Sequence, residues 1–99
     1  MIFEVATIEV KAGAEEDFES GVFEAVTIFR RAQGCRSLRL ERSVEFPSRY
    51  RLVVGWETIE DHTVRFRESP GFQAWRSLVG HTFAASPTVE HTSVVLDGF

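Results

Sequence analysis

The alternation of apolar and polar side chains predicts four β-strands in this chain of 99 residues. The first strand, over residues 2–10, has apolar side chains on both faces, which indicates that it is covered on two sides. Residues 35–44 and 50–57 alternate more regularly, and the Glu45-Phe46-Pro47-Ser48 sequence between them is typical of a turn. These two strands are therefore expected to form a hairpin. Residues 89–96 are expected to form the fourth strand.

Two stretches follow the 3.6-residue period of a helix. Residues 14–31 have acidic side chains in the first turn and arginines in the last, which suits the helix dipole, and Gly34 follows as a C-terminal stop. A second helical region begins at Thr58, which is a good N-cap. Asp61, three residues later, can bond back to Thr58 and complete a variant of the capping box. This region is interrupted once, where Ser69-Pro70 starts a new helix.

The order of these elements is β-α-β-β-α-β, which predicts the ferredoxin-like α+β fold. This fold has a four-stranded antiparallel sheet with both helices on one face. Residues 1–99 are expected to form a single domain, because so short a chain builds one core. The other face of the sheet also carries apolar residues, and a second copy of the chain would cover them most simply. A homodimer is therefore expected.

Charge and cysteine content exclude several kinds of partner. The net charge is −4, so no broad basic field attracts nucleic acid or an anionic membrane. Cys35 is the only cysteine, which excludes an internal disulfide and a thiolate metal cage built from one chain.

No stretch approaches the ~18 apolar residues of a membrane helix, and no leader sequence is evident. A cytoplasmic location is expected.

His62 is the main candidate for chemistry. It lies three residues after Ile59 and four before Phe66, so the three side chains are expected to project together toward the sheet. Trp56 ends the third strand close by. An imidazole in such a place can accept a proton from a phenolic or enolic substrate. The alternative is a core histidine whose nitrogens bond to the backbone or to water.

The other two histidines have simpler interpretations. His91 lies within the fourth strand and is either a second polar group of the pocket or a cross-strand hydrogen-bond partner. His81 follows Gly80 in a loop and is expected to be solvated. The three histidines do not match a metal signature such as HExxH, so no zinc or iron site is expected. No glycine-rich phosphate loop occurs, so no nucleotide cofactor is expected either.

Aromatic side chains complete the candidate site. Phe66, Phe72 and Trp75 follow His62 and are either core residues or the walls of a flat apolar slot suited to an aromatic ligand. Arg67, next to Phe66, falls on the more exposed side and is expected to be solvated.

Three segments carry a resemblance to a known family. They are Gly55-Trp56-Glu57-Thr58-Ile59-Glu60-Asp61-His62, then Phe66-Arg67 with Ser69-Pro70-Gly71-Phe72 and Trp75, and finally Pro87-Thr88-Val89-Glu90-His91. Together they resemble the antibiotic biosynthesis monooxygenase (ABM) domain family, and the likeness extends over nearly the whole chain.

The resemblance implies a homodimer in which two ferredoxin-like sheets face each other as an α+β barrel, with one pocket per subunit. It also implies oxidation of polycyclic phenols to quinones by molecular oxygen, without flavin, haem or metal. Trp56 matches the family's pocket-wall tryptophan, His62 its candidate base or substrate anchor, and His91 the histidine of its last strand. The haem-degrading branch has an asparagine where this chain has Ala6, which argues against haem degradation.

Two functions therefore remain open. The first is a cofactor-independent monooxygenase for a small aromatic, phenolic or quinol-like molecule. In it His62 and Trp56 are catalytic, and the substrate-binding residues are Phe66, Phe72, Trp75 and His91. The second is a non-catalytic dimeric binding or stress-response module in which the histidines are structural.

Overall fold

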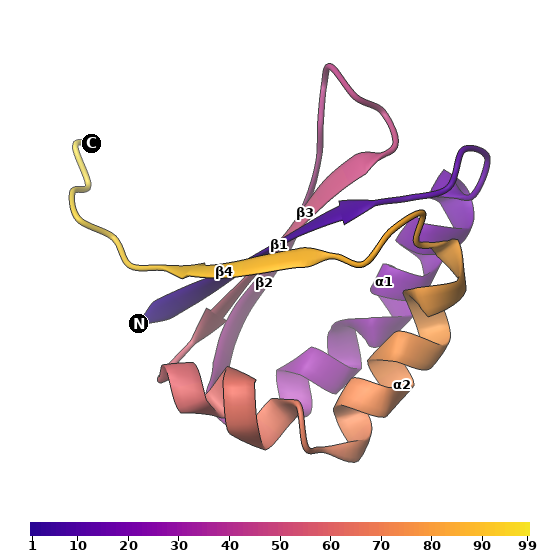
Figure 1. The fold of residues 1–99 in the computed structure, drawn as a ribbon. Coiled ribbons are helices and arrows are strands. Elements are labelled where there is room, and N and C mark those ends of the chain that lie inside the picture. Colours follow the sequence, from indigo (N-terminus) through magenta and orange to yellow (C-terminus); the bar gives the residue numbers. More distant parts are fainter.

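The structure is a computed structural model that describes residues 1–99, and it consists of a sheet layer and a helix layer (Figure 1). In chain order the elements are β1 (Ile2–Glu9), α1 (Glu15–Arg31), β2 (Cys35–Arg42), β3 (Arg49–Trp56), the π-helical turn η1 (Asp61–Phe66), α2 (Pro70–Val79), the 3-10 turn η2 (Gly80–Thr82) and β4 (Thr88–Thr92). This order confirms the predicted ferredoxin-like α+β fold. No helix is both long and apolar enough to cross a membrane.

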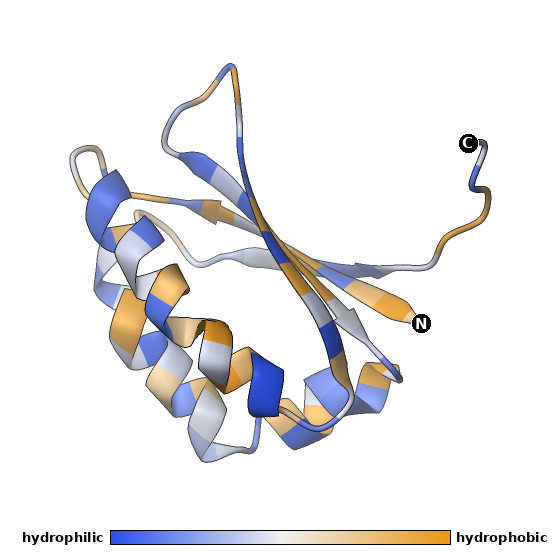
Figure 2. Ribbon diagram, turned by 180° about the vertical axis from the view of Figure 1, so that it is seen from behind, coloured by the Kyte–Doolittle hydropathy of each residue, from blue (hydrophilic) through white to orange (hydrophobic).

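The four strands form one antiparallel sheet in the order β2-β3-β1-β4. Both helices lie against the same face of this sheet, and the opposite face has no cover from the chain (Figures 1 and 2). β1 and β3 are the central strands, so the side chains that they direct at the helices are shielded on all sides. A polar group on that face is therefore cut off from water.

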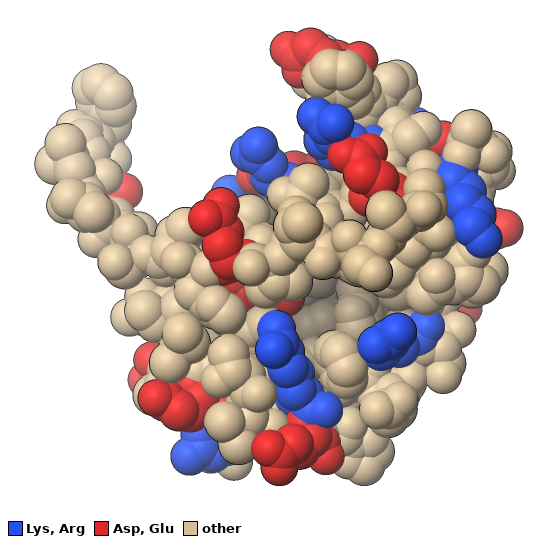
Figure 3. Space-filling view, in the orientation of Figure 1, with Lys and Arg blue, Asp and Glu red and all other residues tan.

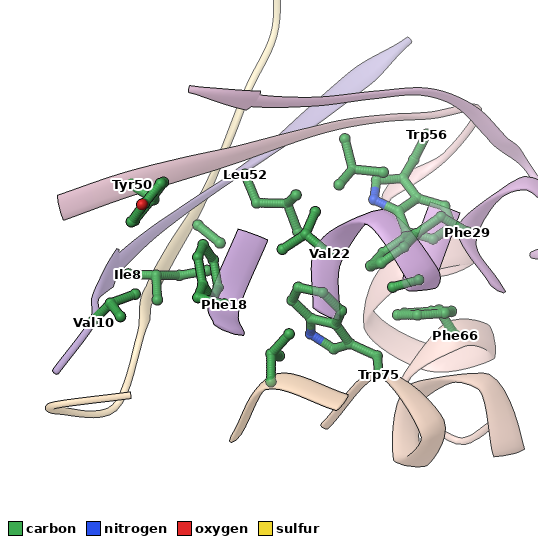
Figure 4. Close-up of a cluster of buried hydrophobic side chains, with 14 residues drawn as sticks. Ile8, Val10, Phe18, Val22, Phe29, Tyr50, Leu52, Trp56, Phe66 and Trp75 are labelled. Atoms are coloured by element: carbon green, nitrogen blue, oxygen red, sulfur yellow. The ribbon is translucent and has the colours of Figure 1, made fainter. Parts of the chain in front are cut away.

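The core lies between the two layers and contains fourteen buried hydrophobic side chains (Figure 4). The predicted inward face of the third strand is confirmed, because Tyr50, Leu52, Val54 and Trp56 are all buried. Helix α1 packs on them with the stripe that includes Phe18, Val22, Ala25 and Phe29.

The fourth strand is shorter than predicted. It ends at Thr92, whereas alternation in the sequence predicts a strand as far as Leu96. The reason is the neighbouring strand: Thr92 pairs with Phe3, and β1 begins at Ile2, so little backbone is left to pair with. Val95 is therefore 96 % exposed, and the C-terminal segment extends away from the body of the protein (Figure 1).

The start of the second helical region is confirmed, but its winding is not as predicted. The Thr58 hydroxyl accepts a hydrogen bond from the Asp61 N–H, and the Asp61 carboxylate accepts one from the Thr58 N–H. The following turn is π-helical, with the Arg67 N–H donating to the His62 carbonyl five residues back. The expectation that Ile59 shares the inward face of His62 is wrong, because the wider turn leaves Ile59 40 % exposed and buries Asp61 instead.

Gly34 lies in the loop between α1 and β2, and its backbone packs against the start of this turn. Its φ of +77° is the left-handed conformation that glycine adopts without strain. A Cβ at this position would clash with Oδ2 of Asp61. Gly34 therefore allows the Asp61 carboxylate to pack against the backbone, which fixes where η1 begins.

Candidate functional site

A cavity of about 440 Å³ opens between the sheet and α2. Its walls are mainly apolar and include Ile8, Leu52, Phe72, Trp75, Phe83 and Val89. Five polar side chains also line it: Glu4, His62, Arg67, Arg76 and Ser86. The surface is visibly hollowed in this region, with basic side chains at the rim (Figure 3).

Another hollow of about 460 Å³ lies between α1 and the segment after η1. Neither an acid nor a histidine lines it, and its polar groups include the exposed Arg31 and Gln33. The cavity beside α2 is the better candidate site, because it combines apolar walls with buried titratable groups.

Two titratable side chains that line the cavity, Glu4 and His62, form a continuous chain of polar contacts with a third, His91, outside it. The Nε2 atom of His62 lies 3.3 Å from Oε1 of Glu4. Its other ring nitrogen, Nδ1, lies 2.8 Å from Nε2 of His91. Glu4 is only 6 % exposed and His62 only 3 %, whereas His91 is half-buried. The contacts therefore run from a buried carboxyl group to a group that reaches the surface.

Strand pairing explains why these residues meet. Glu4 on β1 lies directly opposite His91 on β4 in the antiparallel register. His62 comes from η1, which follows β3 and covers the same end of the sheet. Because strand neighbours and the covering turn meet at one place, residues 4, 62 and 91 form a single cluster.

Trp56 holds this cluster from the core side. Its indole N–H donates to Oε1 of Glu4 over 3.0 Å. Its ring stacks on the His62 imidazole, with centroids 5.4 Å apart and planes 16° from parallel. Trp56 is fully buried and does not line the cavity, so it acts on Glu4 and His62 and has no direct contact with the cavity.

Burial shifts the pKa values of Glu4 and His62 in opposite directions. It raises the pKa of the Glu4 carboxyl to about 7, although the Trp56 N–H and the charge of Arg67 partly oppose the rise. Burial lowers the pKa of His62 to about 4, and the charges of Arg67 and His91 add to this effect. An ion pair between Glu4 and His62 would shift both pKa values the other way. Desolvation outweighs that attraction here, so a neutral pair is favoured between pH 4 and pH 7.

The hydrogen-bond directions are linked to the charge of Glu4. When Glu4 is ionised, His62 donates through Nε2 to the carboxylate and accepts at Nδ1 from His91. When Glu4 is protonated, it can donate to Nε2, and His62 then donates from Nδ1 to His91. The three groups can thus move a proton between the cavity and the surface by reversing two hydrogen bonds.

The predicted site residues fall into two groups in the structure. His62, Phe72 and Trp75 line the cavity, and His91 contacts it through His62. Phe66 does not line this cavity. It is a buried core residue whose ring lies against those of Phe29, Trp56 and Phe72.

Three charged residues of the cavity, Glu4, Arg67 and Arg76, are not among the site residues expected from the sequence. Glu4 lies between Ile2 and Ala6 on the inward face of β1, and a carboxyl group within that apolar series is the signal that points to it. Arg67 is exposed, as predicted, but it also lines the cavity, as does Arg76. Nowhere in the chain do three or more histidine, cysteine, aspartate or glutamate side chains form a group that could hold a metal ion.

Known proteins resemble this chain in sequence and in structure. The protein YczJ of Bacillus subtilis, whose function is uncharacterised, is 37% identical over 91 residues, which are 92% of this chain and 96% of YczJ. A crystal structure from Bordetella bronchiseptica, of a protein assigned as an antibiotic biosynthesis monooxygenase, is 53% identical with a TM-score of 0.95, covering 96% of this chain and 97% of that one.

A more distant structure has the same fold. SnoaB of Streptomyces nogalater, a cofactor-independent oxygenase, is 18% identical with a TM-score of 0.82, covering 98% of this chain and 95% of SnoaB. The family model described as antibiotic biosynthesis monooxygenase matches residues 1–78. With this match over most of its length, and the ferredoxin-like fold of its relatives, the chain belongs to the antibiotic biosynthesis monooxygenase (ABM) family.

Proposed function

We propose that this protein is a cofactor-independent monooxygenase that oxidises a phenolic or quinol-like aromatic substrate with molecular oxygen. The observation that carries the proposal is the cavity of about 440 Å³, which has apolar aromatic walls and is lined by the buried Glu4 and His62, with His62 in contact with the half-buried His91. A cavity of this size holds a small multi-ring molecule. The buried acid gives it a proton acceptor that works near neutral pH.

In this proposal Glu4 accepts the proton of the substrate hydroxyl group. A base is most effective when its pKa lies near the working pH, and burial raises the pKa of Glu4 to about 7. His62 is a weaker base because its pKa is lowered to about 4. His62 therefore relays the proton from Glu4 toward His91 and the surface, while Trp56 holds the ionised carboxylate through its N–H.

The deprotonated substrate then supplies the electrons for the reaction. An electron-rich phenolate can transfer an electron to O₂, and the two resulting radicals combine to form a carbon–oxygen bond. For an anthrone-type ring the methylene carbon loses two hydrogens and gains one oxygen atom. The other oxygen atom leaves as water, so substrate and O₂ balance without a further reductant. SnoaB, a cofactor-independent oxygenase of the same fold, supports this assignment.

We also propose a homodimer formed through the uncovered face of the sheet. One row across that face consists of Arg39, Val53, Val5 and Glu90, from β2 to β4. A two-fold axis parallel to the strands would place the apolar centre of this row on itself and Arg39 over Glu90 of a second copy. Val53→Asp is expected to give a monomer in analytical ultracentrifugation, and a dimer of unchanged affinity would contradict this arrangement.

Oxygen uptake with anthrone-type phenols and quinols tests the proposed reaction. Glu4→Gln keeps an acceptor for the Trp56 N–H but removes the base, so the rate is expected to fall by about 10²–10⁴-fold. His62→Gln breaks the relay and is expected to lower the rate less. His81→Gln is the matched control, because His81 is exposed and outside the cavity.

The results separate the enzyme from a binding module. If the wild type binds aromatic molecules but consumes no oxygen with any of them, a non-catalytic binding role replaces the proposal. Equal rates for the wild type and His62→Gln would remove His62 from the mechanism, and equal rates for Glu4→Gln would remove Glu4.

A further inference from the structure

We infer that the cavity selects aromatic molecules that carry an ionised acid group, such as a carboxylate, and that Arg67 and Arg76 bind this group at the mouth. The inference deepens the proposed function and rests on it, because it specifies the class of aromatic molecule held in the same cavity. Four properties of the two arginines support it.

The first property is that both side chains are free to bind an anion. Half of the ten arginines form ion pairs with carboxylates, namely Arg36, Arg39, Arg42, Arg49 and Arg65. Arg67 and Arg76 form none, and neither guanidinium donates a hydrogen bond within the chain. They are also the only basic side chains that line the cavity. Their donors therefore remain available for a bidentate contact with an acid.

The second property is the sign of the charge at this place. The chain as a whole carries a net charge of −4. The charged groups that line the cavity are Glu4, Arg67 and Arg76, and His62 is neutral above pH 4. Even with Glu4 ionised, the cavity keeps a net positive charge. This local field attracts anions to an otherwise acidic protein.

The third property is the separation of the charges along the cavity. Glu4 and His62 are buried at the inner end, whereas Arg67 and Arg76 are exposed. The aromatic walls formed by Phe72 and Trp75 belong to the same cavity. A flat molecule between these walls can direct a hydroxyl group toward Glu4 and an acid group toward the arginines. Basic side chains are seen at the rim of the hollow in Figure 3.

The fourth property is that both arginines are coupled to the rest of the site. The guanidinium of Arg76 lies over the Phe72 ring, 6.0 Å from its centroid, so a cavity wall also orients the arginine. The charge of Arg67 acts on both Glu4 and His62. Arg67 lines the same cavity as Glu4 and His62, so one molecule in the cavity can engage both ends.

Isothermal titration calorimetry with a matched pair of probes tests the inference. Anthraquinone carboxylate and its carboxamide share the same rings and differ in charge, and neither carries the phenolic hydroxyl group that Glu4 would accept a proton from. The wild type is expected to bind the carboxylate at least about tenfold more tightly than the carboxamide. Arg67→Gln and Arg76→Gln are each expected to remove most of this preference, because each weakens binding of the carboxylate much more than binding of the carboxamide.

Arg30→Gln is the control, because Arg30 also forms no ion pair but lies on α1, away from this cavity. Equal affinity of the wild type for the two probes would overturn the inference. So would a wild type that does not bind the carboxylate at all, or an unchanged preference for the carboxylate in both cavity variants. The outcome is separable from that for the proposed function. If the protein bound the carboxylate selectively but consumed no oxygen, the anion site would be supported and the proposed oxygenase activity would be rejected.

Discussion

Glu4 and His62 are expected to give the stability of this protein two opposing dependences on pH. Burial raises the pKa of Glu4 from 4.5 to about 7 and lowers that of His62 from 6.5 to about 4. Each change corresponds to about 3 kcal/mol, at 1.36 kcal/mol per pKa unit. Both side chains are almost fully buried, so solvent screening reduces these values little.

The signs follow from which state holds the proton. Between pH 4.5 and 7 native Glu4 is protonated and unfolded Glu4 is not, so its contribution to the free energy of unfolding is lost as pH rises. Between pH 4 and 6.5 unfolded His62 is protonated and native His62 is not, so its contribution is lost as pH falls. The windows overlap from pH 4.5 to 6.5, and there the two slopes cancel in the wild type.

Single variants should separate the two slopes. Glu4→Gln leaves the His62 effect, so relative to wild type its stability should gain up to about 3 kcal/mol between pH 4.5 and 7. His62→Gln leaves the Glu4 effect, so relative to wild type its stability should fall by a similar amount between pH 4 and 6.5.

Urea unfolding followed by tryptophan fluorescence, from pH 4 to pH 8, measures both slopes. His81→Gln is the control, and subtracting the wild-type profile removes contributions from all other groups. If both variants changed the slope of stability against pH in the same direction, or if their stability profiles ran parallel to that of the wild type, burial would not govern the pKa values of Glu4 and His62.

Three further substitutions test the packing around the site by the same unfolding measurement. Phe66→Ala should cost about 3–5 kcal/mol, because Phe66 is a buried core residue, and a loss below about 1 kcal/mol would contradict that role. Gly34→Ala should lower stability by more than about 1 kcal/mol through its φ of +77° and its contact with Asp61. Gly80→Ala is its control and should be neutral or slightly stabilising, because no atom lies within 4 Å of the added Cβ. Thr58→Ala should cost about 1 kcal/mol by removing a helix cap, and no change would show that the cap is dispensable.

Most of the fold can be predicted from the sequence, because the positions of the helices and strands depend on local periodicity. The alternation through Tyr50, Leu52, Val54 and Trp56 identifies the inward face of β3, and all four are buried. The reciprocal hydrogen bonds of Thr58 and Asp61 are likewise a local property, set by residues three apart. Such features need no knowledge of distant neighbours.

The end of β4 and the members of the polar cluster depend on contacts between distant segments, so they could not be predicted from the sequence. Val95 continues the alternation of β4 but has no strand beside it, and a strand exists only where another pairs with it. Glu4 is one polar residue in an apolar strand until β4 brings His91 beside it and η1 places His62 over it. Its raised pKa comes from that burial, and burial is a property of the assembled fold that no single segment has.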